Sequence, residues 1–186
     1  MKLQNILLSA ILLTSASFAD NMTVKQEGIK YIKMLGGALK SQLQAKMKED
    51  KSGLTALAFC TGSADKITKE INTKLPEYAS VRRTSFKVRN DKVNTADTTD
   101  KKVMEKFEAE IKAKTLTPKS ILMVEEGDVT RVYKPLVAKK VCLKCHGSNI
   151  DPKIADALKA SYPHDKAIGF KEGDLRGVIV AEIKKH

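Results

Sequence analysis

The sequence predicts an α+β domain in which an antiparallel sheet is flanked by helices, the long ones at the N-terminal end. Three observations predict this fold class. In the first part of the chain, apolar residues recur every three to four positions, which is typical of amphipathic helices. In the second part, two β-branched runs surround Glu125-Glu126-Gly127-Asp128, which is typical of a hairpin. A third β-branched run covers residues 177–183, and 186 residues are enough for one domain.

The first element, residues 1–19, is predicted to be a signal peptide. Met1 and Lys2 give a positive start, residues 6–13 are an apolar run, and Ser17 and Ala19 are the small residues that a signal peptidase requires. We expect cleavage after Ala19 and a periplasmic mature protein. The apolar run is well short of the ~20 residues that span a bilayer, so an uncleaved membrane anchor is the less favoured alternative. We expect no transmembrane segment in the mature chain.

Residues 20–53 are predicted to form a long N-terminal helix that leads into a domain over residues 54–186. Gly36 and Gly37 weaken its middle, and residues 51–53 end it. A second helix is predicted over residues 54–74. The apolar residues on one face of the first helix are Ile29, Ile32, Leu35, Leu39, Leu43 and Met47.

The remaining elements follow from shorter patterns. If the first predicted strand alternates, Arg82, Phe86 and Val88 face the core, while Arg83 and Arg89 face the other side. In chain order, we predict a strand over residues 81–88, a polar loop over 89–100, a helix over 102–114, a hairpin of 121–124 with 129–137, a helix over 152–160 and a strand over 177–183.

Composition and charge exclude several classes of protein. The chain is 42% hydrophobic and 30% charged, which excludes a disordered, collagen-like or purely coiled-coil chain. Lys and Arg number 34 against 22 Asp and Glu, for a formal net charge of +12. The lysines are spread along the sequence and an exported chain rarely meets nucleic acid, so we expect solvated lysines and no nucleic-acid partner. Docking on an acidic protein or on anionic lipid is the alternative.

The chemistry of the sequence is concentrated in Cys142-Leu143-Lys144-Cys145-His146, the five-residue pattern that attaches c-type haem. Two residues between the thiols place both sulfurs along one edge of a porphyrin, where they add to the two vinyl groups. The adjacent His146 then brings an imidazole under the iron as the proximal ligand. Attachment of this type is completed outside the cytoplasm, in agreement with the signal peptide. We therefore predict one covalently attached haem c.

Three other interpretations use the same residues. A thiol–disulfide protein also has Cys-x-x-Cys, but it expects a thioredoxin-like strand before the motif and a long helix after it, whereas a short insert follows here. A zinc site of Cys60, Cys142, Cys145 and His146 would need two adjacent residues as ligands, which tetrahedral zinc seldom takes. A structural disulfide between Cys142 and Cys145 would close a tight, strained loop.

The sixth position of the iron has several candidate ligands. Cys60 is the odd thiol of an exported chain and lies on the apolar face of the second predicted helix, between Ala56 and Ala64. These small neighbours would let a flat macrocycle approach, and ferric iron would hold the sulfur as thiolate. A buried, inert cysteine is the alternative. The rivals are His164, Met34, Met47, Met104, Met123 and an open or water-filled position.

Beyond the pentapeptide, longer motifs accompany Cys60 and its Ala-rich helix. They are Arg83, Ser85, Arg89 and Asn90, then Tyr133-Lys134-Pro135-Leu136, the pentapeptide with Gly147, Tyr162-Pro163-His164-Asp165-Lys166-Ala167-Ile168-Gly169, and Gly173-Asp174-Leu175-Arg176-Gly177. With them, the chain from Ala56 onward resembles the single-haem c-type domain with a PAS-like fold, long catalogued as a domain of unknown function.

In that family, the domain occurs alone in the periplasm or as the sensory input of membrane signalling proteins. The resemblance implies a PAS-like antiparallel sheet with a c-type haem insert, and His146 with Cys60 as the ligands of the iron. Asp91 departs from the family pattern, in which Pro usually follows the position of Asn90. This departure concerns the geometry of that loop and not the haem.

Haem propionates that are partly buried need cationic partners. Arg83 and Arg89 lie in the matching segment and are the predicted partners, with Arg82 and Arg176 as further candidates. The alternation of the strand separates Arg82 from Arg83 and leaves open which of them meets the cofactor.

Two functions follow from the predicted ligands, and we expect neither to be enzymatic, because no acid–base residue marks an open iron position. The first is a redox- or ligand-sensing haem domain that acts on a signalling partner. An axial thiolate stabilises ferric iron and lowers the potential relative to a Met ligand, which suits a switch. The second is a small soluble electron-transfer cytochrome that docks on a redox partner through lysines. A thiol–disulfide protein is the further alternative.

Overall fold

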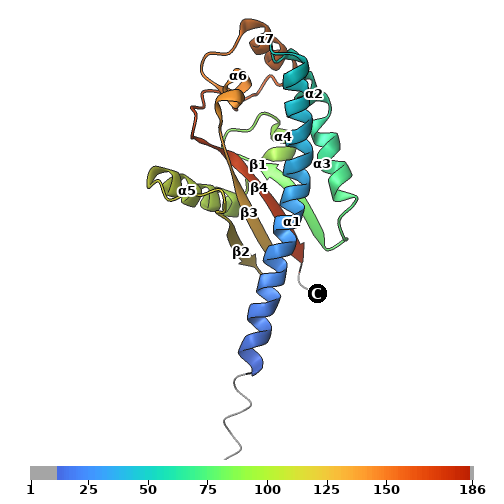
Figure 1. Cartoon of the computed structure of the whole chain (residues 1–186), viewed down its shortest axis with the longest axis vertical. Helices are drawn as coiled ribbons and strands as arrows, with labels where there is room; N and C mark the ends of the chain where they lie inside the picture. The colour runs from blue at the N-terminus through green and yellow to red at the C-terminus, as the bar shows by residue number, and fades with distance from the viewer. Residues whose placement is uncertain (1–11, 185–186) are drawn as a thin grey trace, which may run out of the picture.

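The computed structural model describes residues 12–184, with side chains from Thr23 onward. Residues 1–11 of the predicted signal peptide lie outside this range. A four-stranded antiparallel sheet in the order β1-β4-β3-β2 forms the centre of the fold (Figure 1). Its strands are β1 (Ala79–Thr84), β2 (Leu122–Glu126), β3 (Val129–Val137) and β4 (Leu175–Lys184). The predicted antiparallel sheet, its hairpin and its final strand are therefore confirmed.

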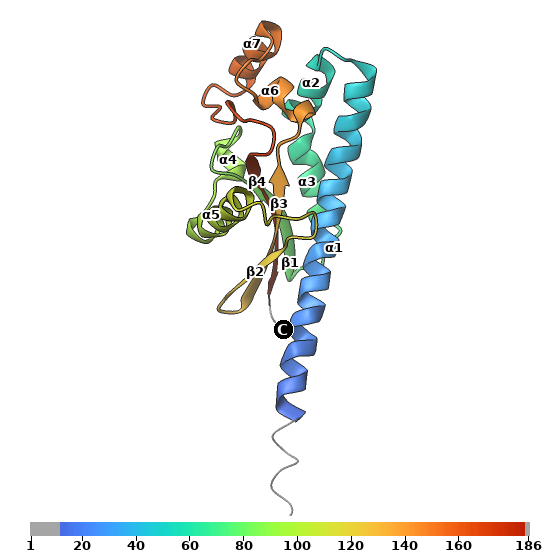
Figure 2. The same cartoon turned by 60° about the vertical axis from the view of Figure 1, so that its left-hand side comes forward.

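Helices cover both faces of this sheet (Figure 2). On one face lie α1 (Leu12–Glu49) and α3 (Ala64–Asn72), and the core there includes Leu35 of α1 and Ile179 of β4. On the other face lies α5 (Thr98–Lys112), whose Phe107 packs with Tyr133 and Val180. Residue alternation along the strands separates the two cores, because successive side chains of a strand point to opposite faces.

Glycines let α1 approach the sheet closely. A Cβ at Gly28 would lie 2.5 Å from Val132 Cγ2, and one at Gly36 would lie 3.0 Å from Ile179 Cδ1. Gly36 therefore serves helix–sheet packing, and α1 runs unbroken through the position where the sequence predicts a weak point. Its N-terminal turns extend past the sheet (Figure 1). Within residues 12–184, no helix is long and apolar enough to cross a membrane.

The prediction of a single helix over residues 54–74 is wrong, because two helices occupy that range. They are α2 (Leu54–Gly62) and α3, and they are separated at Ser63, whose φ of −123° is not helical. Gly62 and Ser63 are weak helix formers, so tertiary packing decides the break. Leu57 of α2 packs with Ile154, whereas Ile71 of α3 packs against the sheet, and one straight helix cannot make both contacts.

The segment after β1 also differs from the prediction. The strand ends at Thr84 instead of residue 88, and Phe86, which strand alternation predicts in the core, is 40% exposed. The predicted polar loop contains the short helix α4 (Asp91–Asn94) and the start of α5. Asp97 caps α5, and Asp100 is fully buried because it accepts hydrogen bonds from Arg82 and Tyr133.

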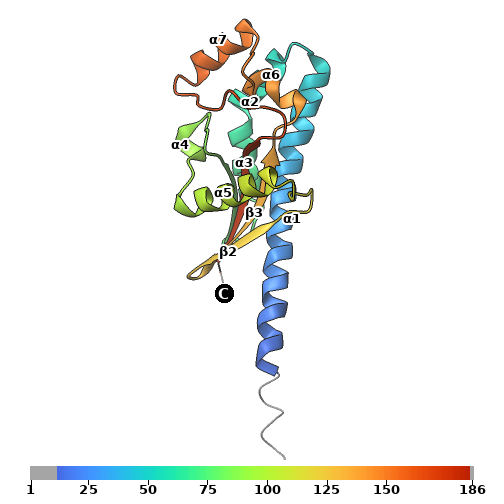
Figure 3. The ribbon, with the colours of Figure 1, turned by 90° about the vertical axis from the view of Figure 1, so that its left-hand side faces the viewer.

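The last elements gather at one end of the sheet. They are the 3-10 turn η1 (Lys140–Cys142), α6 (Leu143–His146) and α7 (Pro152–Ser161), and they lie with α2 beyond the end of β3 (Figures 1 and 3). The end of β3 leads directly into the pentapeptide. Pro135 is tolerated in β3 because β2 pairs only as far as Tyr133, so the proline has no neighbour on that side that needs an N–H donor.

Candidate cofactor site

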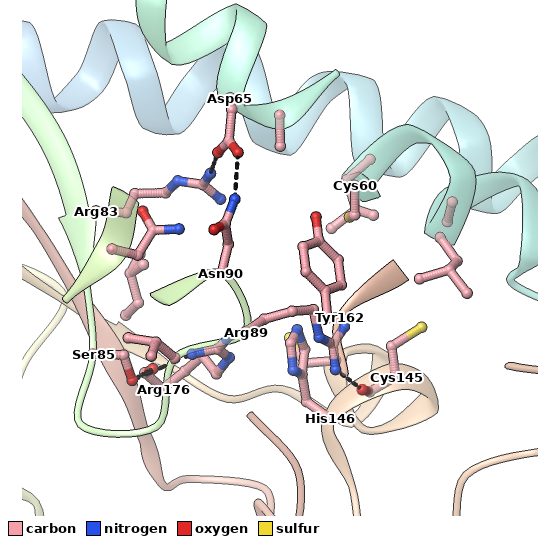
Figure 4. Close-up of a pocket in the computed structure, with 18 of the residues that line it drawn as sticks. Cys60, Asp65, Arg83, Ser85, Arg89, Asn90, Cys145, His146, Tyr162 and Arg176 are labelled. Carbon is pink, nitrogen blue, oxygen red and sulfur yellow. Dashed lines mark hydrogen bonds and ion pairs between the residues drawn. The ribbon is translucent and has the colours of Figure 1, made fainter. Parts of the chain in front are cut away.

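A cavity of about 260 Å³ lies between α2, the end of β1 and the pentapeptide (Figure 4). It brings together all of the predicted site residues, although they come from distant parts of the chain. Cys142, Cys145 and His146 line it from the pentapeptide, Cys60 from α2, and Arg83 and Arg89 from β1 and the following loop.

The pentapeptide adopts one tight turn of helix. Cys142 ends η1 and the next four residues form α6, which is capped when the Gly147 N–H donates to the Leu143 carbonyl at 2.9 Å. Cys142 and Cys145 are not joined by a disulfide. Among the side chains that the structure describes, no three of His, Cys, Asp or Glu are arranged to hold a metal ion.

The ring of His146 is held in one protonation state. Its Nδ1 lies 2.7 Å from the carbonyl oxygen of Ala167, which only accepts hydrogen bonds, so Nδ1 carries the proton and the Nε2 lone pair stays free. Burial, together with the charges of Arg176 and Arg89, lowers the pKa of His146 to about 2. The imidazole is therefore neutral at physiological pH, the form that binds a metal.

Cys60 is the second potential iron ligand in the cavity. Burial, and secondarily Cys145, raise the pKa of its thiol, so the thiolate needs an added positive charge such as a metal ion. Ala56, one turn before Cys60, and Ala64, at the start of α3, are buried and line the same cavity. Cys60 and its two small neighbours therefore lie together in the cavity wall.

The structure places Cys60 in the cavity wall and most of the other candidate iron ligands outside it. Met47 of α1 also lines the cavity. His164 is exposed and does not line it, and Met104 belongs to α5 and is buried on the opposite face of the sheet. Met34 and Met123 pack against the core under α1. Met47 is thus the rival of Cys60 that the geometry retains.

Strand pairing decides which arginine of β1 reaches the cavity. Arg83 pairs with Ile179 and lines the cavity, with its Nη2 3.6 Å from Asp65 Oδ1. Its Nε is buried and has no hydrogen-bond partner among the described residues. Arg82 points to the opposite face, where it pairs with Asp100 and Glu182. The prediction that Arg82 is a partner of the cofactor is therefore wrong.

A bulge in β4 directs Arg176 into the same cavity. The register shifts at this point, since Leu136 pairs with Gly177 and Val137 pairs with Leu175, and Arg176 is the extra residue. Leu175 accordingly packs on the α5 side with Val178, while Arg176 lines the cavity. Burial lowers the pKa of Arg176 to about 10, and the charges of Arg89 and Arg83 add to this effect. No carboxylate of residues 12–184 forms an ion pair with it.

Arg89 makes more hydrogen bonds with the rest of the protein than Arg83 or Arg176 does. Its Nε donates to Asp165 at 2.9 Å, and its Nη2 donates to the carbonyl of Cys145 at 2.6 Å. Its side chain is only 10% exposed. Arg89 therefore lies in the cavity wall with most of its hydrogen bonds already made.

Some lining residues are not predicted as site residues from the sequence. Leu43 of α1, Asp65 of α3 and Tyr162 after α7 all line the cavity, and Tyr162 points its hydroxyl toward α2 (Figure 4). Leu43 lies on the apolar stripe of the first helix, which predicts burial but not a cavity. For Asp65 the sequence holds no signal, because its role depends on how α3 packs beside β1.

The donor set fits an iron porphyrin that carries two carboxylates. Two cysteines and a neutral imidazole lie in the spacing that attaches haem, and Cys60 faces the same space. Arg83 and Arg176 place cationic groups with incomplete partners in the wall, which suits two propionates. These residues define a PAS-like α+β domain with a cysteine- and histidine-lined cofactor cavity.

Comparison with known proteins agrees with this class. The chain belongs to the Tll0287-like family, whose model matches residues 8–183. Among solved structures, the crystal structure of the cyanobacterial heme-protein Tll0287 is similar, with a TM-score of 0.60 at 22% sequence identity. The similarity covers 91% of this chain and 96% of that chain. No curated protein matches the sequence.

The family resemblance and the fold class inferred from the sequence are thereby confirmed. The matched range begins well before Ala56, where the motifs of the resemblance begin, and includes all of α1. This agrees with the contribution of Leu43 and Met47 to the cavity wall.

Proposed function

We propose that this chain is an exported, periplasmic haem protein with one covalently attached haem c. Cys142 and Cys145 would form the thioether bonds, and His146 and Cys60 would be the axial ligands of the iron. The observation that carries the proposal is the convergence of these four residues on one cavity. The solved structure that resembles the chain, a heme-protein, supports it. Bound haem would supply a one-electron iron couple.

The role that we propose for this domain is redox or ligand sensing, without enzymatic activity. A thiolate from Cys60 would favour ferric over ferrous iron and would give the bound haem a low potential. Lys144 of the pentapeptide donates a hydrogen bond to the Lys51 carbonyl in the turn between α1 and α2. A change at the cofactor would therefore have two routes to α1, through α2 and through this turn, and the N-terminal turns of α1 that extend past the sheet would be the surface for a signalling partner.

A second candidate function is electron transfer. Lys139, Lys140 and Lys144 are exposed around the pentapeptide, and they would favour docking on an acidic redox partner. A carrier that exchanges electrons with high-potential partners needs a high potential, whereas the sensor needs a low one. A spectroelectrochemical titration of the mature protein therefore distinguishes the two functions.

The covalent haem is tested by the intact mass of protein made in cells that mature c-type cytochromes. We expect the mass of residues 20–186 plus one haem, which checks the cleavage after Ala19 at the same time. A mass equal to the bare polypeptide would overturn the proposal and favour a thiol–disulfide protein.

The axial ligand is tested by a matched pair of variants. Cys60→Ala should shift the ferric spectrum and raise the potential, because the iron loses its thiolate. Met47→Leu should leave both unchanged, because Leu keeps the volume of a cavity residue that does not bind iron. The reverse outcome would make Met47 the ligand, and two unchanged spectra would mean an open position.

A further inference from the structure

We propose that Arg89 and Asp165 form a positioning pair for His146, which holds the imidazole in one orientation and thereby adjusts the potential of the iron. This inference rests on the proposed function and deepens it, because it assigns Arg89 to the proximal ligand instead of to a propionate. Asp165 has no assigned role in the site so far.

The pair contacts both sides of His146 along the backbone. Arg89 Nη2 donates to the carbonyl of Cys145, the residue before His146, at 2.6 Å (Figure 4). The same nitrogen also lies 3.4 Å from the carbonyl of Ala167, which accepts the Nδ1–H of His146. One guanidinium thus connects the helix that carries the imidazole with the carbonyl that orients it.

Asp165 completes the connection from the other end. Its Oδ2 accepts the Nε–H of Arg89 at 2.9 Å, and its Oδ1 accepts the backbone N–H of Ala167 at 2.7 Å. Ala167 is fully buried, and the side chains of Arg89 and Asp165 are 10% and 9% exposed. Charge-assisted hydrogen bonds at this burial are among the stronger ones in a protein, so they fix the backbone of Ala167, whose carbonyl orients the imidazole.

Backbone hydrogen bonds anchor the segment on both sides of Ala167, and before it the N–H of Lys166 donates to the carbonyl of Val88 at 2.9 Å. The N–H of Gly169 donates to the carbonyl of Gly147, and the N–H of Phe170 donates to the carbonyl of His146, both at 2.9 Å. The Phe170 ring meets His146 edge-to-face at 6.3 Å. These contacts hold the segment on either side of Ala167, whereas Arg89 approaches the carbonyl of Ala167 itself and Asp165 accepts the N–H of the same residue.

The chemical consequence follows from how histidine binds metals. A hydrogen bond from the non-coordinating nitrogen fixes the ring and makes the coordinating nitrogen more basic, and loss of such a partner typically changes metal binding by about 10–100-fold. A more basic imidazole favours ferric over ferrous iron. Loosening the Ala167 carbonyl should therefore raise the potential.

Two roles for Arg89 predict opposite signs. If Arg89 acts as a positive charge beside the cofactor, its removal favours ferric iron and lowers the potential. If it positions His146, its removal weakens the Nδ1–H bond and raises the potential. Arg176 provides the matched control, because it also lines the cavity and its charge also acts on His146, yet it contacts neither Cys145 nor Ala167.

The experiment compares the haem-loaded wild type with Arg89→Gln, Asp165→Asn and Arg176→Gln. We expect Arg89→Gln to raise the potential by about 59 mV for one electron. This shift corresponds to a change of about tenfold in the ferrous-to-ferric ratio. The Nδ1–H proton of His146, followed by NMR after transfer to deuterated water, should exchange at least about tenfold faster in Arg89→Gln and Asp165→Asn. Arg176→Gln should lower the potential and leave this exchange unchanged.

A lower potential in Arg89→Gln with unchanged proton exchange would overturn the positioning role alone and restore Arg89 as a partner of the propionates. If Arg89→Gln does not fold, the exchange rate in Asp165→Asn decides, because Asn keeps the size of the side chain and an acceptor for the Ala167 N–H. A wild type without haem would overturn the proposed function itself, and this inference with it.

Discussion

Gly177 is the residue at which a single methyl group should do the most damage to this fold. It follows Arg176 in the bulge of β4 and has a φ of +149°, which L side chains rarely adopt. A Cβ there would lie 2.3 Å from the carbonyl oxygen of Thr84 and 3.0 Å from Ser85 Cβ. The nearest of these is a backbone atom of β1, so no side-chain rotation relieves the clash.

The cost of Gly177→Ala has two parts. Holding an alanine in this backbone conformation costs about 1–3 kcal/mol. Forcing a methyl group into closed packing costs about another 1–3 kcal/mol. We therefore expect the free energy of unfolding to fall by about 2–6 kcal/mol, and the melting temperature by about 2–4 °C for each kcal/mol.

Equilibrium urea unfolding of the haem-loaded proteins measures this loss, and two other glycines serve as controls. Gly127 in the β2–β3 turn has a φ of +61° with no atom within 4 Å of its Cβ position, so Gly127→Ala should cost only about 1–2 kcal/mol. Gly37 lies in α1 and is equally open, so Gly37→Ala should stabilise by about 0.5–1 kcal/mol. If Gly177→Ala lowers the free energy of unfolding by no more than Gly127→Ala does, the result would contradict the close approach of β4 to β1 at the bulge.

Two further predictions concern the frame around the site. The side chain of Asn72 exchanges two hydrogen bonds of 2.8 Å with the backbone of Val81 on the edge strand β1, so Asn72→Ala should cost about 1–3 kcal/mol for each buried group left unpaired, measured by urea unfolding. Asn149→Ala, at an exposed position, should cost almost nothing. Although burial opposes it, hydrogen bonds from the Asp100 N–H and Arg131 lower the pKa of Asp97 below its ordinary value. The ionised carboxylate therefore stabilises the fold above that value, and the stability disappears as the pH falls through the folded pKa. Asp97→Asn should flatten the acid limb of stability against pH, and an unchanged limb would contradict this contribution.

The sequence predicts best what depends on neighbours along the chain. The hairpin, the helix now seen as α5, α7 and β4 follow from local periodicity and turn residues, and the structure confirms each within a few residues. The pentapeptide likewise needs only local spacing to bring its two thiols and its imidazole to one cavity wall. Cys60 could be singled out because an odd thiol between small residues is uncommon on a helix face.

The wrong predictions share a different cause. The break at Ser63, the end of β1 at Thr84 and the burial of Asp100 all depend on partners far away in the sequence. Asp100 illustrates this best, because within a polar stretch it looks like a loop residue until Arg82 and Tyr133 donate to it. Propensity and periodicity carry no information about such partners.

For this protein, the sequence alone determined the class of fold, the family and the residues that carry reactive groups, because these depend on patterns a few residues long. Only the tertiary structure decided which arginines meet those groups. Strand pairing sent Arg82 to one face of the sheet and Arg83 to the other, and one extra residue in β4 turned Arg176 into the cavity. The sequence names both Arg82 and Arg176 as candidates, but since a bulge inverts the alternation of every residue before it, strand periodicity could not tell which of them reaches the cavity.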